Sequence, residues 1–244
     1  ASIISTPLSI LANFGIFLID PNGTETGSVA VVIVLGVLSI ALALVFGALA
    51  PLFVTTEVVR PGAKVSTVDA RVSTADGQVL VIARAQRIRS APVEFPDGVE
   101  ETPPDLPPQA SDTSAWPGAV VAFHSHATEH RFVRGRFGEV GPCFDWVRLA
   151  VPVVPGEEPT GWQRAAAVAD FANGISAVVP FDGRSMFINP DLTVHLWREP
   201  VAEWIGTDAA TRTSDTGIGM SEAALWDRSG RVGRGLQSLL LDRS

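Results

Sequence analysis

The longest feature in the hydrophobic pattern is an apolar run over residues 29–54, VAVVIVLGVLSIALALVFGALAPLFV, which contains no charged side chain. A run of 18 or more apolar residues is typical of a membrane-spanning helix. However, Val and Ile favour strands, and Gly36, Gly47 and Pro51 interrupt the run where bends or strand ends would fall. We therefore predict strands buried on both faces, with a membrane span as the alternative.

The second half of the chain alternates apolar and polar positions in short segments. FDWVRLAVPVV, residues 144–154, is typical of a strand. An alanine-rich segment follows and predicts one helix, capped by Thr160 and ended by Gly174. Turn signals then separate four predicted strands, which are SMFINPDLTVHLWR, EWIGTDAATRT, IGMSEAALWD and RVGRGLQSLLLDR. A lone helix must bury its apolar side, and an antiparallel sheet curled around it is the simple solution.

A proline-rich segment separates the two halves. Residues 91–129 contain seven prolines and a cluster of acidic residues, which break any helical or strand period. We therefore expect an N-terminal module at 1–90, a linker at 91–129 and a C-terminal module at 130–244.

The two modules share an internal repeat. The segment that starts at Leu192 aligns with the segment that starts at Leu38, and Gly230 then aligns with Gly77. The alignment places the apolar run on strands of the second half and therefore predicts strands over 29–54. It also places the alanine-rich helix on SILANFGIFLID, around Ile16.

Composition narrows the possible functions. The net charge of −8 makes nucleic acid or an anionic membrane an unexpected partner. The single cysteine, Cys143, rules out an internal disulfide, and together with the absence of a basic segment at the start it favours a cytoplasmic protein. An apolar face on residues 29–45 would be explained by a subunit interface, so we expect a homo-oligomer.

Particular stretches of the chain resemble the acyl-CoA thioesterase II family, in its actinobacterial thioesterase-like branch. They are VTTEVVRPGAKV, DGQVLVIARAQRIR, WVRLAVPVVPGEEPTGWQRAAAVADFANGIS, LTVHLWREP and DRSGRVGRGLQSLLLDR. The resemblance implies an α+β double hotdog, in which two tandem repeats each wrap an antiparallel sheet around one helix. Relatives open with a strand and a His-Gly-Gly stretch that residues 1–50 lack, so we expect the N-terminal hotdog to be incomplete.

The resemblance also implies an activity, the hydrolysis of a fatty acyl-CoA thioester to free acid and CoA by an activated water, with no cofactor and no metal. Matched position by position, the family's water-holding residues are Asp170, Asn189 and Gln237. Asp170 would be the general base, Gln237 would orient the water, and Asn189 stands where relatives often carry a hydroxyl residue. The aligned positions of the first half, Ile16, Leu35 and about Arg84, offer no such trio. We therefore expect one active site per chain.

Each of these residues also has a structural interpretation. Asp170 could be a solvated or capping acid, Asn189 a turn residue before Pro190, and Gln237 a partner of neighbouring backbone. The corresponding alternative function is a module that binds acyl-CoA or lipid without turnover.

Two other constellations carry weaker signals. The three histidines of HSHATEH, which are His124, His126 and His130, suggest a metal only weakly, because no Cys or carboxylate set accompanies them. Cys143 has no clear His or Asn partner in the sequence, which favours a structural role.

Overall fold

The computed structural model describes residues 12–20, 52–91, 101–106, 123–153, 156–182 and 184–243, with the backbone alone for 12–20 and 243. Strands dominate the described part of the chain, and short helices accompany them. The strands are β1 (Ala12–Asp20), β2 (Leu52–Arg60), β3 (Val65–Thr74), β4 (Val79–Arg89), β5 (Thr128–Arg134), β6 (Cys143–Leu149), β7 (Ser185–Ile188), β8 (Leu192–Leu196), β9 (Trp204–Thr213), β10 (Ile218–Asp227) and β11 (Gly230–Arg243). The helices are α2 (Phe123–His126), α3 (Gly161–Ala169) and α4 (Ala172–Ile175).

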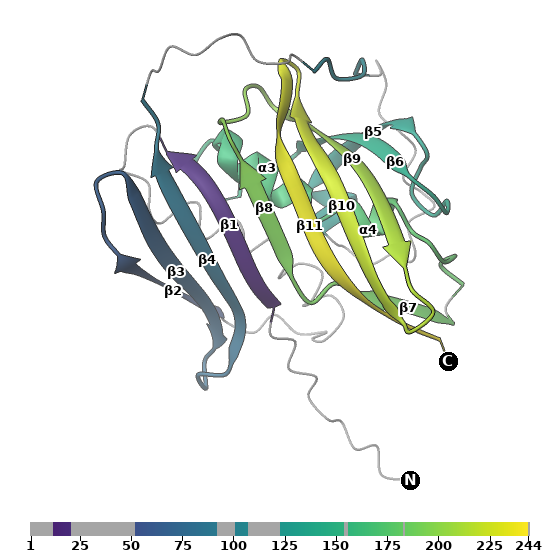
Figure 1. Ribbon diagram of the computed structural model, residues 1–244, viewed down its shortest axis with the longest axis horizontal. Helices are drawn as coiled ribbons and strands as arrows, with labels where there is room; N and C mark the ends of the chain where they lie inside the picture. Colours follow the sequence, from purple (N-terminus) through teal and green to yellow (C-terminus); the bar gives the residue numbers. More distant parts are fainter. Residues whose placement is uncertain are drawn as a thin grey trace.

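These strands form one curled sheet in the order β2-β3-β4-β1-β8-β11-β10-β9-β6-β5, with β7 paired to the end of β11 (Figure 1). Neighbouring strands are antiparallel except around β1, which runs parallel to both β4 and β8. β1 therefore joins the N-terminal strands to the C-terminal ones within one sheet.

The helix predicted around Ile16 is wrong, because residues 12–20 form β1. The repeat alignment transferred a helix from an alanine-rich segment onto ANFGIFLID, which is rich in Phe and Ile and so has the residues of a strand. Most of the apolar run over 29–54 lies outside the described residues, and its last three residues open β2. No helix in the described part of the chain combines the length and apolar character needed to cross a membrane.

The alanine-rich segment is helical as predicted, but the helix is broken. Thr160 caps α3 through a capping box with Gln163, in which each side chain accepts from the other residue's backbone N–H. α3 ends at Ala169, and α4 begins at Ala172 and ends at Ile175 rather than at Gly174. The interruption falls at Asp170 and Phe171.

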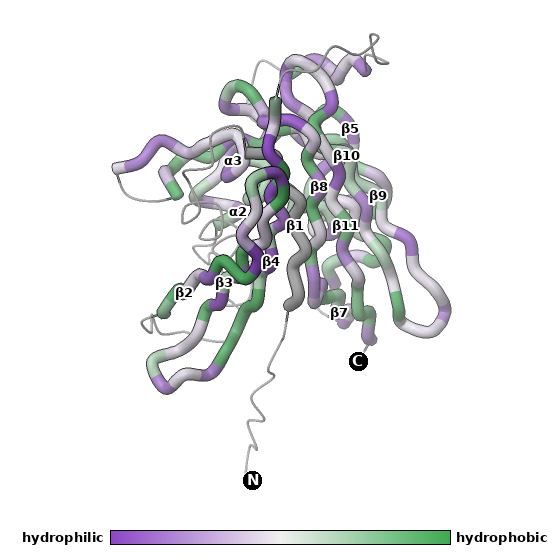
Figure 2. The backbone as a smooth tube through the Cα atoms, turned by 60° about the vertical axis from the view of Figure 1, so that its left-hand side comes forward, coloured by the Kyte–Doolittle hydropathy of each residue, from purple (hydrophilic) through white to green (hydrophobic). Residues whose placement is uncertain are grey.

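The sheet curls around these helices. α3 lies on one side of β8, β10 and β11, as the turned view of Figure 2 shows. α3 buries almost its whole length, and its run of small alanines lets the strands approach closely. α4 packs on β9, β10 and β11, which places the break between α3 and α4 above the C-terminal sheet.

The segment SMFINPDLTVHLWR forms two strands rather than the single one predicted. β7 and β8 are separated by Asn189, Pro190 and Asp191. Proline has no N–H to donate to a sheet, so it ends the first strand and frees Asn189 from the ladder.

One hydrophobic cluster connects the two halves of the chain. It is built from β3, β4, α3, β8, β10 and β11, and its fully buried members include Val72, Ala165, Val194 and Val232. The hairpins β3–β4 and β10–β11 each turn at a glycine with positive φ, Gly77 and Gly230, which are the two glycines that the repeat aligned.

Part of the predicted linker packs on the C-terminal half. The indole of Trp146 donates to the carbonyl of Pro104, and Glu101 pairs with Arg231. α2 and the first residues of β5 also lie within 91–129, while 92–100 and 107–122 lie outside the described residues.

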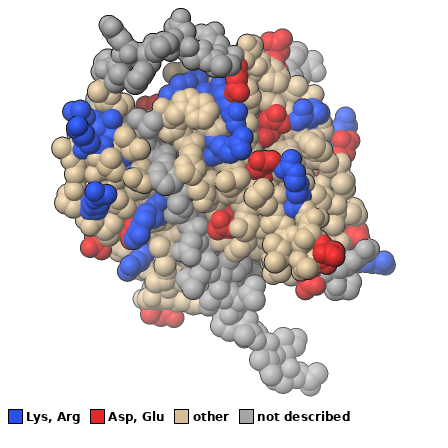
Figure 3. All heavy atoms as spheres, in the orientation of Figure 1, with Lys and Arg blue, Asp and Glu red and all other residues tan. Residues whose placement is uncertain are grey.

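The outer face of the sheet mixes acidic and basic side chains (Figure 3). On β9, β10 and β11, Glu222 pairs with both Arg212 and Arg234. On the view shown, acidic and basic side chains are thus mixed over this face, and several basic side chains gather near its upper end.

Candidate active site

Asp170 lies at the interruption between α3 and α4, where it is the C-terminal capping residue of α3. Its side chain is buried, with 3% of the residue exposed, so the interpretation of Asp170 as a solvated acid is wrong. Burial raises the pKa of the Asp170 carboxyl from its ordinary value of 3.8 to about 6, against the opposing effect of hydrogen bonds from Asn189 and Gln237. A carboxyl group with this pKa can exchange a proton near neutral pH.

The three residues matched by resemblance lie together. Asn189, in the connection after β7, donates its Nδ2 to Asp170 Oδ1 at 2.9 Å. Gln237, on β11 and 1% exposed, donates its Nε2 to the same oxygen at 2.9 Å. The other carboxyl oxygen, Oδ2, is buried and has no hydrogen-bond partner among the described residues. One oxygen of Asp170 is thus held by two amides, and the second is left to act on another group.

Gln237 also closes the break in the helix. Its Nε2 donates to the backbone carbonyl of Asp170 at 3.2 Å, and its Oε1 accepts from the backbone N–H of Asn173 at 3.2 Å. These backbone groups would otherwise be buried and unpaired at the irregular turn. The Nε2 of Gln237 therefore donates to both the backbone carbonyl and the carboxyl group of Asp170.

Asn173 is a fourth member of the network that sequence reasoning did not assign. Its side-chain Nδ2 donates to Asn189 Oδ1 at 3.4 Å. The signal was present in the sequence, since Asn173 follows Asp170 by three residues, the spacing that brings two residues to one face of a helix.

In the first half, Arg84, which lies close to the position aligned with Gln237, forms an ion pair. Arg84 forms a bidentate ion pair with Asp69, at 2.7 Å for each contact. Leu35 lies outside the described residues, and only the backbone is described at Ile16.

The histidines near α2 have different partners and surroundings. His130 and Asp145 form a buried pair, with His130 Nδ1 2.5 Å from Asp145 Oδ2, and His130 Nε2 lies 2.9 Å from Thr128 Oγ1. Burial lowers the pKa of His124 to about 4. Within the described residues, no three His, Cys, Asp or Glu side chains gather closely enough to hold a metal ion.

Cys143 is buried at the start of β6. Burial raises the pKa of its thiol well above its usual range, so the thiolate form is disfavoured. This environment agrees with the expected structural role.

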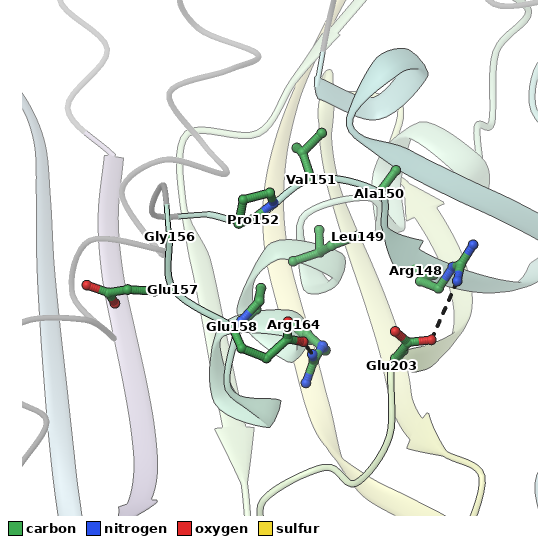
Figure 4. A pocket seen from close by; sticks show the side chains of 11 residues that line it. Arg148, Leu149, Ala150, Val151, Pro152, Gly156, Glu157, Glu158, Arg164 and Glu203 are labelled. Atoms are coloured by element: carbon green, nitrogen blue, oxygen red, sulfur yellow. Dashed lines mark hydrogen bonds and ion pairs between the residues drawn. The ribbon is translucent and has the colours of Figure 1, made fainter.

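A hollow of about 610 Å³ opens beside the start of α3 (Figure 4). Arg148 and Arg164 line it, but each is paired with a glutamate, Glu203 and Glu158 respectively. Both arginines among the described lining residues are therefore already paired with carboxylates. Neither Asn189 nor Gln237, the residues that hydrogen-bond to the Asp170 carboxyl group, lines it.

The sequence and the fold both have relatives. Residues 100–241 match the model of the acyl-CoA thioesterase C-terminal domain. No curated protein matches the chain.

Several solved structures have a similar fold. A protein described as a thioesterase II from Thermobifida fusca superposes with a TM-score of 0.57 at 18% identity, covering 79% of this chain and 73% of that one. An acyl-CoA thioesterase II from Mycobacterium marinum gives 0.53 at 16% identity, covering 78% and 73%. A protein with a hot dog fold from Alicyclobacillus acidocaldarius gives 0.58 at 17% identity, covering 81% and 75%. At these identities the likeness is one of fold.

Proposed function

The chain belongs to the acyl-CoA thioesterase II family and is a thioester hydrolase, and on that premise we propose that it cleaves a fatty acyl-CoA to the free acid and CoA, with Asp170 as the general base. One observation carries the assignment of the base. Asp170 is buried, its Oδ1 is held by two amides, and its Oδ2 has no partner among the described residues. A carboxylate in this state has one oxygen fixed for orientation and one free to take a proton.

The reaction follows from that geometry. Asp170 Oδ2 takes a proton from a water as the water oxygen bonds to the thioester carbonyl carbon. The tetrahedral intermediate then collapses, the carbon–sulfur bond breaks, and the sulfur receives the proton from Asp170. The products are the carboxylic acid and CoA, and Asp170 is again ionised. Asn189 and Gln237 act through Asp170, because their amide N–H groups hold Oδ1 and direct Oδ2 to the water.

The proposal includes the division of the chain into modules. Two hotdog modules, at 1–90 and 130–244 with the segment 91–129 between them, would carry one active site in the C-terminal module. The continuous sheet and the shared cluster of buried residues support a joined pair of modules. We further propose a cytoplasmic homo-oligomer that acts on acyl-CoA and binds neither nucleic acid nor membrane.

Thiol release is the direct test of the activity. Purified protein would be mixed with acyl-CoAs of increasing chain length, and the freed CoA thiol would be titrated. Release that depends on acyl length and is lost in Asp170→Asn would support the proposal. Retention of acyl-CoA with no release by the parental protein would instead identify a binding module.

The pH dependence should show Asp170 directly. Because the ionised form is the base and the pKa of its carboxyl is raised to about 6, kcat/KM should rise with pH, reach half of its plateau near pH 6 and level off about one unit above that. A profile of kcat/KM from pH 4.5 to 8 measures this. An acid limb near pH 4, the range of an ordinary aspartate, would show that another group is the base.

Gln237→Ala should reduce turnover less than loss of the base. The change removes one of two N–H groups on Asp170 Oδ1, so we expect kcat to fall roughly tenfold. Ser238→Ala is a matched control, since Ser238 is the neighbouring residue of β11 and is exposed on the opposite face. Equal effects of the two substitutions on kcat would contradict a specific role for Gln237.

A further inference from the structure

Asn173 contacts both amides that hold Asp170. Its backbone N–H donates to Gln237 Oε1, and its side-chain Nδ2 donates to Asn189 Oδ1. Asn173 is 7% exposed, so water replaces these contacts poorly. Neither contact reaches Asp170 itself, which places Asn173 one step behind the carboxyl group.

The contacts select one orientation of each amide. A side-chain amide has a donor end and an acceptor end, and rotation by half a turn exchanges them. The backbone N–H of Asn173 can only donate, so it holds the oxygen end of Gln237. The side chain of Asn173 directs its Nδ2 to Asn189, and in this orientation it holds the oxygen end of Asn189. The nitrogen ends must then face Asp170 Oδ1, as the structure shows. In the reversed orientation, each amide would place a carbonyl oxygen against the carboxylate.

The break between α3 and α4 makes the backbone contact available. In a continuous helix the N–H of Asn173 would bond to the carbonyl of Ala169. With the helix interrupted at Asp170, that N–H belongs to the first turn of α4, where helices leave N–H groups without partners. At the far end of α4, away from this N–H, Ser176 Oγ bonds to Ala172 O and lies 2.8 Å from Thr211 Oγ1 of β9.

The ionisable side chains on the strands under α4 point away from this network. On the strands under α4, Arg212, Glu222 and Arg234 lie on the outer face of the sheet, where Glu222 pairs with both arginines, and Asp208 pairs with Arg134. Strand alternation places these side chains opposite to Gln237.

On the inner face, the ring of His130, which pairs with Asp145, contacts Phe171 edge-on at 5.4 Å between centroids. On α3, Arg164 pairs with Glu158 at the start of the helix, away from Asp170. The amides are therefore the polar side chains that bond to the Asp170 carboxyl group.

We infer that Asn173 is a positioning residue, which fixes Asn189 and Gln237 so that both donate to Asp170 Oδ1 and leave Oδ2 for the attacking water. The inference rests on the proposed function, in which Asp170 is the base. Without the Asn173 side chain, Asn189 is free to rotate and its N–H no longer stabilises the ionised carboxylate. The carboxyl group then binds its proton more tightly and is aimed less well.

The experiment compares Asn173→Ala and Asn173→Leu with Ser176→Ala in the full chain. Leu keeps the volume of Asn without its donor. Ser176→Ala removes a buried hydrogen bond from the same helix without touching the carboxyl network. Two quantities are measured, the pH profile of kcat/KM for acyl-CoA hydrolysis and the ¹³C NMR titration of the Asp170 carboxyl, assigned by its loss in Asp170→Asn.

Both Asn173 variants should move the acid limb and the carboxyl titration upward by about one pH unit and lower kcat on the order of tenfold. Ser176→Ala should leave the carboxyl titration in place. A parental titration midpoint in both Asn173 variants, or an equal shift in Ser176→Ala, would overturn the inference. The NMR titration needs no turnover, so it can be measured even if the parental protein is inactive. If the parental protein does not hydrolyse acyl-CoA but the Asp170 titration still moves in the Asn173 variants, the proposed function is refuted and the positioning role of Asn173 is not.

Discussion

Asp170→Asn is expected to lower kcat for acyl-CoA hydrolysis by about 10²-fold or more, with the affinity for acyl-CoA nearly unchanged. Asparagine keeps the shape of the side chain, and its Oδ1 can still accept from Asn189 and Gln237. It places an NH₂ group where the carboxylate has its unpartnered Oδ2. The variant therefore keeps the packing of the site and loses the group that takes a proton from water.

Single-turnover kinetics on the variant would separate chemistry from binding. Asp191→Asn is the matched control, because Asp191 lies two residues beyond Asn189 and its Oδ1 accepts from the backbone N–H of Ser238, a bond that asparagine can keep. Hydrolysis by Asp170→Asn at the parental rate would remove Asp170 from the mechanism. Such a result, combined with acyl-CoA binding, would favour the binding module.

The C-terminal half of the fold could be predicted because local and tertiary preferences agree there. Thr160 and Gln163 form the capping box at the expected helix start, and β8 buries its apolar positions Leu192, Val194 and Leu196 and leaves the polar ones between them more exposed. The break at Asp170 could not be predicted in this way. It depends on Gln237, which is distant in sequence and supplies the partners for the backbone groups that the break exposes.

The strand β1 was mispredicted for a different reason. Its segment was assigned by alignment to the second half rather than from its own residues, and the parallel pairing with β4 and β8 has no counterpart in a repeat-based prediction. The candidate trio came from the resemblance position by position. The geometry adds that both amides bond to one oxygen, and that Asn173 holds them.

The burial that raises the pKa of the Asp170 carboxyl should also destabilise the fold at neutral pH. The pKa of its carboxyl is about 6 in the folded chain against 3.8 ordinarily, so folding favours the protonated form. The stabilisation from that proton is fully present below about pH 4 and is lost as the pH rises through about 6. Two pKa units correspond to on the order of 3 kcal/mol between these limits.

Asp170→Asn has no proton to lose over this range, so its free energy of unfolding should rise relative to the parental protein by on the order of 3 kcal/mol between pH 4 and pH 7.5. Urea unfolding of both proteins at a series of pH values measures the difference, and other titrating groups, including Asp145, cancel because both proteins contain them. We therefore expect Asp170→Asn to be inactive and, as the pH rises, to become more stable relative to the parental protein. Both results have one reason, because an ionised carboxylate that serves the chemistry is buried at a cost to folding. A stability difference that stays constant with pH would mean that Asp170 titrates as an ordinary aspartate, and the case for it as a base poised near neutrality would fail.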